Sequence, residues 1–522
     1  MRIAAQSYAV NPHFRGVWPI VLTAGLLCAV GCGNDKDAAA GSDSAAVDTA
    51  TAGDAASDAV VAAAGFTSTL PSALATPAWA ASGWSPAHVA RLDADVRHRG
   101  LREVRGLIHA HTAYSHDACD GEPFDKEGKI NVACIEDFRR DICTVGHDFV
   151  FMTDHPTHFK DHPFPDVLHY NAAAGDKLVE RNGKAIANRM ACKDGHTVLL
   201  IPGTEGGMMA VGLDGHIEDE TLRAKTYGGD DLAAREAFIA AGAHVLAQHT
   251  EDWTAAQLGE AGWAGFEMYN LHANMMARIK EAGLMVPTML NEKETMEPDL
   301  LLLPLVEEDP RYLKTWAEVA EAGHRRVTTM GTDCHRNTFP LKISDGERVD
   351  SYRRMMIWFS NHLLVEAAAD GSVDDQALEA ALVQRRLFGV FEVFGYAEGF
   401  DARIVSAAKP TDKAVDKAVE IGGEISLAAQ PVIIADTPHV AYLPAGAEAP
   451  IIRTRIVQAK AGAWVEVASG DGEITFAPTT AGAYRVEVRM TPKHLRVHLG
   501  SRSALADKEF LWIYANIFYV TP

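Results

Sequence analysis

Positive charge is scarce in this sequence. Its 48 Lys and Arg residues stand against 70 Asp and Glu residues, which gives a formal net charge of −22. A surface that follows a nucleic acid backbone needs the opposite sign, because every phosphate carries negative charge. The deficit therefore excludes broad binding of DNA or RNA, and no nucleic acid partner is expected.

A long apolar run is also missing near the N-terminus, where the run from Val17 to Val30 is too short to span a bilayer comfortably. Arginines precede this run, as is typical of a cleaved targeting segment. Its end, Leu27-Cys-Ala-Val-Gly31-Cys32, resembles the lipobox of bacterial lipoproteins. By this resemblance residues 1–32 form a signal peptide and Cys32 becomes the lipidated first residue of the mature chain. The alternatives are a plain secretory signal cut elsewhere and an uncleaved anchor.

Aromatic residues are absent from the segment between Cys32 and Phe66, which consists almost entirely of Ala, Asp, Ser, Thr, Val and Gly. Such a composition cannot bury enough apolar surface to become ordered. We therefore expect residues 33–80 to form a disordered tether. Together with a lipid anchor in the membrane, this tether predicts a cell-envelope lipoprotein, either periplasmic or on the outer surface.

The remaining length is enough for two folded domains, since 48% of the 522 residues are hydrophobic and 23% are charged. A helix is expected to begin at Trp84-Ser-Pro86 and to pack outside the first domain. From about Leu101 short apolar strands alternate with helical stretches, a pattern typical of a parallel sheet or barrel. We therefore expect an α/β barrel domain over residues 81–400.

Short alternating strands dominate the chain after that point, and they predict a small all-β sandwich over residues 401–522. In the stretch 484–489, Tyr484, Val486 and Val488 alternate with Arg485, Glu487 and Arg489. This alternation predicts a half-buried antiparallel sheet with one apolar face and one polar face. Nothing in this region indicates catalysis.

Ligand-type residues stand at the predicted ends of the barrel strands, where such folds carry their chemistry. His109 and His111 are separated by one residue, so on a strand both side chains project to one face. Imidazole suits zinc, manganese and iron. The full set of candidate metal ligands comprises His109, His111, Asp117, His155, Glu205, His216, His249, Asp333 and His335.

The order of these residues resembles the motifs of the PHP superfamily, named after polymerase and histidinol phosphatase. The motifs read His109-Ala-His-Thr-Ala-Tyr-Ser115, Thr153-Asp-His155, Pro202-Gly-Thr-Glu205, His216, His249 and Asp333-Cys-His335. The resemblance covers roughly residues 100–400. It implies a distorted (β/α)7 barrel that holds two or three divalent transition metal ions, zinc, manganese or iron. It also implies that Glu205 and Asp333 bridge the ions and that the histidines and Asp117 are terminal ligands.

Several assignments around this set stay open. His116 is an alternative to Asp117, and His216 could instead be a solvated loop histidine. Asp154 is expected to orient His155, and Glu267, a charged residue in an apolar strand, is expected to support a ligand from behind. Arg336 is a candidate phosphate clamp, because a guanidinium can bind two oxygens at once, or else a surface arginine. The histidines taken as surface or structural residues are His158, His162, His169, His196 and His244.

Cysteine is rare beyond the tether, where it occurs at Cys119, Cys134, Cys143, Cys192 and Cys334. Export permits disulfides, and an odd number leaves one thiol unpaired. We expect disulfides among the first four cysteines. The favoured pair is Cys119 with Cys134, because it closes a short loop. Cys334 is expected to remain free, since its neighbours fix it beside the metals.

A metal cluster of this kind activates water and neutralises the charge of a phosphoryl group. The predicted function is therefore a metal-dependent phosphoesterase that acts on a small phosphate ester, with Glu205, Asp333 and Arg336 as catalytic residues. One alternative is a hydrolase of non-phosphorus ester or amide bonds, since metals polarise either group. Another is a non-catalytic, metal-stabilised surface binding protein, although the complete ligand set argues against it.

Overall fold

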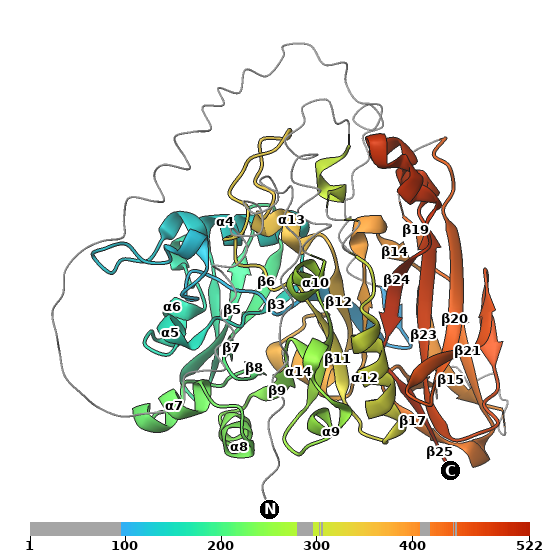
Figure 1. Ribbon diagram of the computed structural model, residues 1–522. Helices are drawn as coiled ribbons and strands as arrows, with labels where there is room; N and C mark the ends of the chain where they lie inside the picture. The colour runs from blue at the N-terminus through green and yellow to red at the C-terminus, as the bar shows by residue number, and fades with distance from the viewer. Residues whose placement is uncertain are drawn as a thin grey trace, which may run out of the picture.

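A computed structural model of the chain describes residues 96–278, 296–301, 303, 306–407, 418–441, 443 and 446–522 (Figure 1). The predicted signal peptide, the lipidation site Cys32, the tether and the helix expected from Trp84 lie outside the described residues. Among the residues that are described, none of the helices has the length and apolar character needed to cross a membrane.

The first sheet of the N-terminal half is built on three parallel strands, β2 (Leu101–Ile108), β3 (Phe149–Phe151) and β6 (Thr197–Ile201). β3 and β6 are mainly apolar, β2 also contains charged residues, and all three strands are mostly buried, as expected for strands covered on both faces. The other strands of this half of the sheet are antiparallel to their neighbours and comprise β1 (Arg97–His98), β4 (Lys177–Arg181), β5 (Lys184–Ala191), β12 (Ser360–Val365) and β13 (Leu387–Val390).

The second sheet has the strand order β11-β10-β9-β8-β7. Its parallel strands are β9 (His244–Ala247), β10 (Gly265–Asn270) and β11 (Val327–Gly331), and its antiparallel hairpin is β7 (Gly203–Glu205) with β8 (Met209–Val211). The two sheets meet just beyond the ends of β2 and β11, where Ala110 forms a parallel bridge with Cys334. The expected seven-stranded barrel is not confirmed, because the described strands of this half belong to two sheets and form no closed barrel.

Helices follow the strands as the sequence predicts. Asn131 caps α4 by accepting a hydrogen bond from the Cys134 N–H, and Gly146 ends this helix in the left-handed conformation. Asp309 caps α12, whose first residue is Pro310. The described α-helices are α4 (Val132–Val145), α5 (Pro156–Phe159), α6 (Phe164–Val167), α7 (Glu220–Tyr227), α8 (Leu232–Ala240), α9 (Ala255–Leu258), α10 (Leu271–Ala277), α12 (Pro310–Glu321), α13 (Tyr352–Met356) and α14 (Asp375–Val383).

Strands also dominate the described chain after Phe400, and they belong mainly to two sheets. One sheet contains β15 (Asp401–Ser406), β16 (Val419–Glu420), β18 (Pro431–Asp436) and β22 (Ile474–Phe476). A short separate pair joins β14 (Ala397–Glu398) to β19 (His439–Val440). The other sheet contains β17 (Glu424–Ser426), β20 (Ile451–Lys460), β21 (Ala463–Gly470), β23 (Gly482–Thr491), β24 (Phe510–Ala515) and β25 (Phe518–Thr521).

This last sheet is not separate from the N-terminal half. Strand β24 pairs antiparallel with β13, with Phe388 opposite Ala515 and Val390 opposite Ile513. The strands of both halves thereby join into one 14-stranded sheet. The expected boundary at residue 400 consequently separates two segments whose strands are hydrogen-bonded neighbours (Figure 1).

The expected polar face of β23 is buried rather than solvated. Arg485 is 0% exposed and Glu487 is 1% exposed. The Arg485 guanidinium lies 4.1 Å from the ring centre of Trp316 in α12 and 4.3 Å from that of Trp464 in β21. Helix α12 therefore covers this face of the sheet (Figure 1). Alternation of polar and apolar residues cannot distinguish a face that meets water from one that meets a helix.

Candidate metal centre

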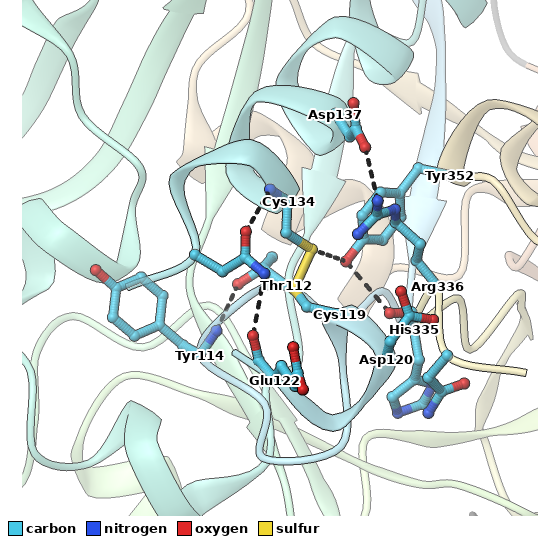
Figure 2. The surroundings of a disulfide bond; sticks show 12 residues. Thr112, Tyr114, Cys119, Asp120, Glu122, Cys134, Asp137, His335, Arg336 and Tyr352 are labelled. Atoms are coloured by element: carbon cyan, nitrogen blue, oxygen red, sulfur yellow. Dashed lines mark hydrogen bonds and ion pairs between the residues drawn. A yellow bond between two sulfur atoms is a disulfide. The ribbon is translucent and has the colours of Figure 1, made fainter. Parts of the chain in front are cut away.

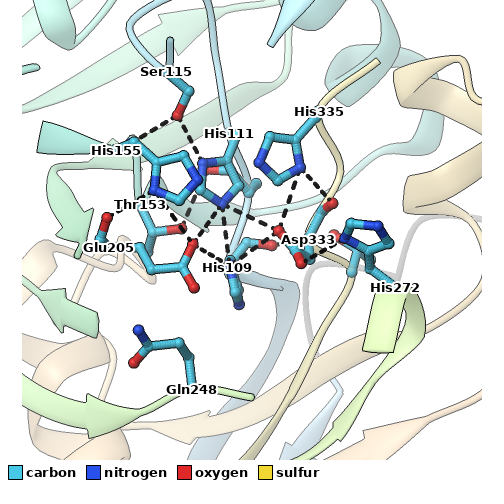
Figure 3. A network of polar contacts seen from close by, with 12 residues as sticks. His109, His111, Ser115, Thr153, His155, Glu205, Gln248, His272, Asp333 and His335 are labelled. Atoms are coloured by element: carbon cyan, nitrogen blue, oxygen red, sulfur yellow. Dashed lines mark hydrogen bonds and ion pairs between the residues drawn. The ribbon is translucent and has the colours of Figure 1, made fainter. Parts of the chain in front are cut away.

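Most of the predicted ligands converge where the strands of the two sheets end (Figure 3). His109 and His111 follow β2, Glu205 ends β7, and Asp333 lies just beyond β11. These four side chains are at most 3% exposed. His249 follows β9 and is 36% exposed, so the cluster is open on its side. The convergence of strand ends is the feature that the sequence predicts.

Four atoms that could ligate a metal ion face one another at the centre of this cluster. His109 Nε2 lies 3.1 Å from His111 Nε2, 3.1 Å from Glu205 Oε2 and 3.3 Å from Asp333 Oδ1. His111 Nε2 lies 3.0 and 3.2 Å from the same two oxygens. Ligands placed tetrahedrally at about 2.0–2.1 Å from zinc would lie roughly 3.3–3.4 Å apart, which is close to this spacing. Asp333 Oδ1 is buried without a well-aligned hydrogen bond in the described part of the chain. These residues fit a divalent cation.

A second group of donors lies beside the first. His335 Nε2 is 3.2 Å from Asp117 Oδ2, and His155 Nε2 is 3.6 Å from the same oxygen. The rings of His111 and His335 are stacked with centres 3.8 Å apart. Ligand atoms of His111, His155 and His335 all lie within 4.8 Å of one another. Asp117 therefore occupies the position for which His116 was the alternative.

The histidines of both groups share one orientation, with Nδ1 directed outward and Nε2 directed inward. Outward partners of this kind fix the tautomer and the ring plane of a metal-binding histidine. The outward contacts are His109 Nδ1 to Glu267 Oε1 at 2.6 Å, His111 Nδ1 to Ser115 Oγ at 2.7 Å, His155 Nδ1 to the Glu205 carbonyl at 2.9 Å and His335 Nδ1 to the Asp333 carbonyl at 2.9 Å.

Glu267 thus lies behind His109, where a supporting residue was expected. Its other oxygen accepts hydrogen bonds from the His249 N–H and from the Asn270 side chain, both at 3.2 Å. Gly331 makes room for it, since a Cβ at that position would lie 1.9 Å from Glu267 Oε1. Glycine at the end of β11 therefore leaves the space that this carboxylate occupies.

Neighbouring charges shift the pKa values of the histidines and carboxylates in this cluster. Burial by itself would lower the pKa of His109, but the charges of Glu205, Glu267 and Asp333 raise it well above its usual value. Burial would raise the pKa of Glu205, yet His109 and the other imidazoles lower it well below its usual value. The carboxylates therefore stay ionised and draw cations toward the ring nitrogens. A divalent metal and protons would compete for those nitrogens.

His216 is not brought into the cluster. Its Nδ1 lies 3.0 Å from the Tyr227 hydroxyl, and its Nε2 lies 2.8 Å from the His162 carbonyl. The ring packs against Phe159 and Phe164, with centre distances of 5.0 and 4.7 Å. Both ring nitrogens are thus engaged in an aromatic pocket, and the expectation of a metal ligand at this position is corrected.

Two further expectations also differ from the structure. Asp154 does not orient His155. Its carboxylate instead accepts hydrogen bonds from the backbone N–H and hydroxyl of Thr112, at 2.5 and 2.7 Å, and so fixes the turn after His111. Arg336 forms an ion pair with Asp137 at 3.1 Å (Figure 2). Because its guanidinium is held by this carboxylate, Arg336 is not placed as a phosphate clamp.

His272 lies in the cluster although sequence reasoning passed over it. It belongs to the first turn of α10, and its Nδ1 is 3.1 Å from Asp333 Oδ2 (Figure 3). No motif of the superfamily points to this residue. The signal that could have found it is the strand-end rule, because His272 comes two residues after the end of β10.

The disulfides border the same site. Cys119 pairs with Cys134, Cys143 pairs with Cys192, and Cys334 is a buried free thiol, which confirms the expected pattern. The backbone N–H of Cys119 donates to the His335 carbonyl at 3.1 Å. The Cys119–Cys134 disulfide therefore anchors the loop that lies against His335 (Figure 2).

Comparison with known proteins gives little. No protein family model and no curated protein matches the chain. A crystal structure of a two-domain protein from Bacteroides vulgatus, described as containing a predicted PHP-like metal-dependent phosphoesterase, is similar at 12% identity. The match covers 81% of this chain and 98% of that chain, with a TM-score of 0.31. A likeness this distant supports no conclusion about fold or activity.

Proposed function

We propose that this protein is a metal-dependent hydrolase of the PHP superfamily, and specifically a phosphoesterase for a small phosphate ester. The observation that carries the proposal is the convergence of His109 Nε2, His111 Nε2, Glu205 Oε2 and Asp333 Oδ1 within 3.0–3.3 Å. The order of the motifs along the sequence supports the superfamily. Two or three divalent ions, zinc, manganese or iron, suit this set of imidazoles and carboxylates.

Each group of residues has a distinct part in this proposal. His109, His111, Glu205 and Asp333 would hold one ion, and Asp117, His155 and His335 would hold another. Bound ions supply Lewis acidity toward a phosphoryl oxygen. Glu267 keeps the Nδ1 proton on His109 and thereby leaves Nε2 as the ligand atom. His249 and His155, at 36% and 21% exposure, form the part of the site that a substrate can reach.

The net charge of −22 favours a small ester over DNA or RNA, because long polyanions are repelled. Residues 1–32 and the tether support a place in the cell envelope of a bacterium, with Cys32 carrying the lipid. Replacing Cys32 by Ala should release the protein from the membrane fraction. A Cys32→Ala protein that stays membrane-bound would contradict the lipid anchor and leave the hydrolase proposal intact.

The activity is tested by loading the purified protein with zinc, manganese or iron and offering it four substrate classes. These are phosphomonoesters, phosphodiesters, carboxylic esters with amides, and single-stranded DNA. The expected result is turnover of a small phosphate ester that requires metal and is absent from Glu205→Gln. Turnover of carboxylic esters or amides alone would replace the phosphoesterase by another hydrolase. Bound metal without turnover of any class would favour the surface binding protein, and DNA as the best substrate would refute the charge argument.

A further inference from the structure

We propose that His272 is a metal ligand of this centre and takes the place that the motif order gives to His216. This inference rests on the proposed metal centre and names a residue of that centre that lies outside the superfamily motifs. His216 cannot serve without giving up its hydrogen bonds to Tyr227 and to the His162 carbonyl. The centre would then lack an imidazole on one side unless another residue supplied it.

The two oxygens of Asp333 show which side that is. Oδ1 faces the histidine pair, 3.3 Å from His109 Nε2 and 3.2 Å from His111 Nε2. Oδ2 faces away from this pair and lies 3.1 Å from His272 Nδ1 and 3.5 Å from His249 Nε2. The carboxylate therefore presents one oxygen to the pair His109 and His111 and the other oxygen to the pair His249 and His272.

Glu205 divides its oxygens in the same way. Oε2 lies 3.1 and 3.0 Å from the Nε2 atoms of His109 and His111, whereas Oε1 lies 3.1 Å from His249 Nε2. Two carboxylates that each direct their two oxygens to different histidines are suited to bridging two cations, since shared negative charge offsets the repulsion between neighbouring ions. His249 and His272 are the imidazoles on the far side of these bridges.

The local fold holds His272 in place for this role. Asn270 ends β10 and caps α10, because its side chain accepts a hydrogen bond from the Ala273 N–H at 2.9 Å. The amide of the same side chain donates to Glu267 Oε2 at 3.2 Å. The strand end that positions the partner of His109 thus also positions the helix turn that carries His272. Ligand atoms of His272, Asp333 and His335 all lie within 4.8 Å of one another.

The rival role for His272 is a hydrogen bond to Asp333 without any contact with metal. Two substitutions separate the two roles. Gln can still donate a hydrogen bond to a carboxylate but is a poor ligand for transition metals, whereas Ala removes both functions. The matched control is His216→Gln, which changes the same residue type in the aromatic pocket.

The experiment loads the wild-type protein and the three variants with zinc, dialyses them, and measures zinc per chain by elemental analysis. Cobalt loading with its visible absorption spectrum gives a second readout of the ligand set. We expect His272→Gln and His272→Ala each to retain roughly one equivalent fewer than wild type and to change the cobalt spectrum. His216→Gln should match wild type in both measurements.

Two outcomes overturn the assignment. His272→Gln with the full complement of zinc and an unchanged cobalt spectrum would make His272 a hydrogen-bond donor only. Loss of an equivalent from His216→Gln, with none lost from His272→Gln, would restore the motif-based ligand. A wild-type protein that binds no metal would refute the proposed metal centre itself. Failure of the proposed function is thereby distinguishable from failure of the His272 assignment alone. Circular dichroism of the metal-free variants checks that each is folded, and the partial exposure of His272, at 18%, favours that result.

Discussion

Two clusters of buried charge lie in different halves of the molecule, and they are balanced in different ways. At the metal centre, the ion-pair partners of Glu205 and Asp333 within the described part of the chain are all histidines. At the second cluster, Glu487 is paired with the guanidiniums of Arg485 and Arg455. The carboxylates of both clusters are almost completely excluded from solvent.

The difference lies in the kind of cation that each cluster contains. A guanidinium stays charged at any ordinary pH, so the cluster around Glu487 is balanced by the chain itself. An imidazole balances a carboxylate only after it takes up a proton, and a metal ion can replace that proton. Burial of carboxylates is therefore common to a structural site and a candidate metal site. The two kinds of site differ in whether the positive charge can be exchanged, as when a metal ion replaces the proton of an imidazole.

The largest effect is expected from Glu205→Gln, which removes a carboxylate from the exchangeable cluster at nearly constant volume. We expect activity to fall by at least the roughly 100-fold that loss of a supporting partner can cause, and metal content to fall with it. The metal-free variant should unfold at a similar denaturant concentration to the metal-free wild type. Metal-dependent turnover at wild-type rates in this variant would contradict the proposed role of Glu205 in the metal centre.

The corresponding change in the self-balanced cluster is Glu487→Gln. It leaves three nearby arginines, Arg485, Arg455 and Arg489, without their shared counter-ion in a buried site. We expect a loss of about 3–5 kcal/mol in the free energy of unfolding, with metal content unchanged. Denaturant unfolding and elemental analysis of the same sample measure both. A stable Glu487→Gln variant that loses metal would break the distinction between the clusters.

A third cluster is also built on a histidine, but it is not one of the groups of described side chains that could hold a metal ion. His98 Nε2 contacts Glu103 at 2.6 Å, and His98 Nδ1 contacts Asp401 at 3.1 Å. Burial would lower the pKa of His98, but these two carboxylates raise it from 6.5 to about 9. Because the folded-state pKa is the higher one, this stabilisation is complete below about pH 6.5 and is lost as pH rises through about 9.

Wild type should therefore lose up to about 3 kcal/mol more than His98→Gln between pH 6 and 10. Denaturant unfolding across this pH range, in the presence of a chelator, measures the difference. Parallel stability curves for the two proteins would show that the contacts of His98 do not depend on its charge.

The smallest effect is expected from Glu267→Gln, which weakens the partner of His109 without removing a ligand. Metal affinity should fall by about 10-fold to 100-fold, as is usual for such partners, and saturating metal should restore most of the activity. Competition with a chelator of known affinity measures the shift. Gly331→Ala should act in the same direction, since its Cβ would displace the Glu267 carboxylate.

The parts of this arrangement that follow from local periodicity were predictable from the sequence. His109 and His111 were expected on one face because one residue separates them. Their Nε2 atoms do meet, 3.1 Å apart, although both residues lie just beyond β2 and His109 has a positive φ of 86°. The ends of buried strands place Glu205 and Asp333 near them. His216 was misassigned because it lies in a loop, where no strand register fixes its direction. Arg336 follows His335 directly, yet adjacency in sequence does not show that Asp137 would bind it.

Long-range pairing was beyond prediction for a different reason. Nothing in residues 387–390 indicates that their free edge is matched by residues 513–515, and a closed barrel would have satisfied the same local pattern. The expectation that the polar face of β23 meets solvent was wrong for the same reason. The helix that covers this face, α12, lies more than 150 residues earlier in the sequence. A sequence pattern specifies that a face is polar, but its neighbour decides whether that face is wet.

The shared sheet also has a consequence for the order of events during folding. Asn516 binds β11 through hydrogen bonds in both directions, accepting from the Thr328 N–H at 2.9 Å and donating to the Thr328 carbonyl at 2.9 Å. Strand β11 leads directly to Asp333, so the strand that carries this ligand acquires its last partner only when residue 516 of 522 has been made. Until residues 510–516 are in place, β13 has an unpaired edge that is exposed to wrong strand pairing. Completion of the metal centre therefore depends on the C-terminal end of the chain, although its first histidines are among the earliest residues of the described fold.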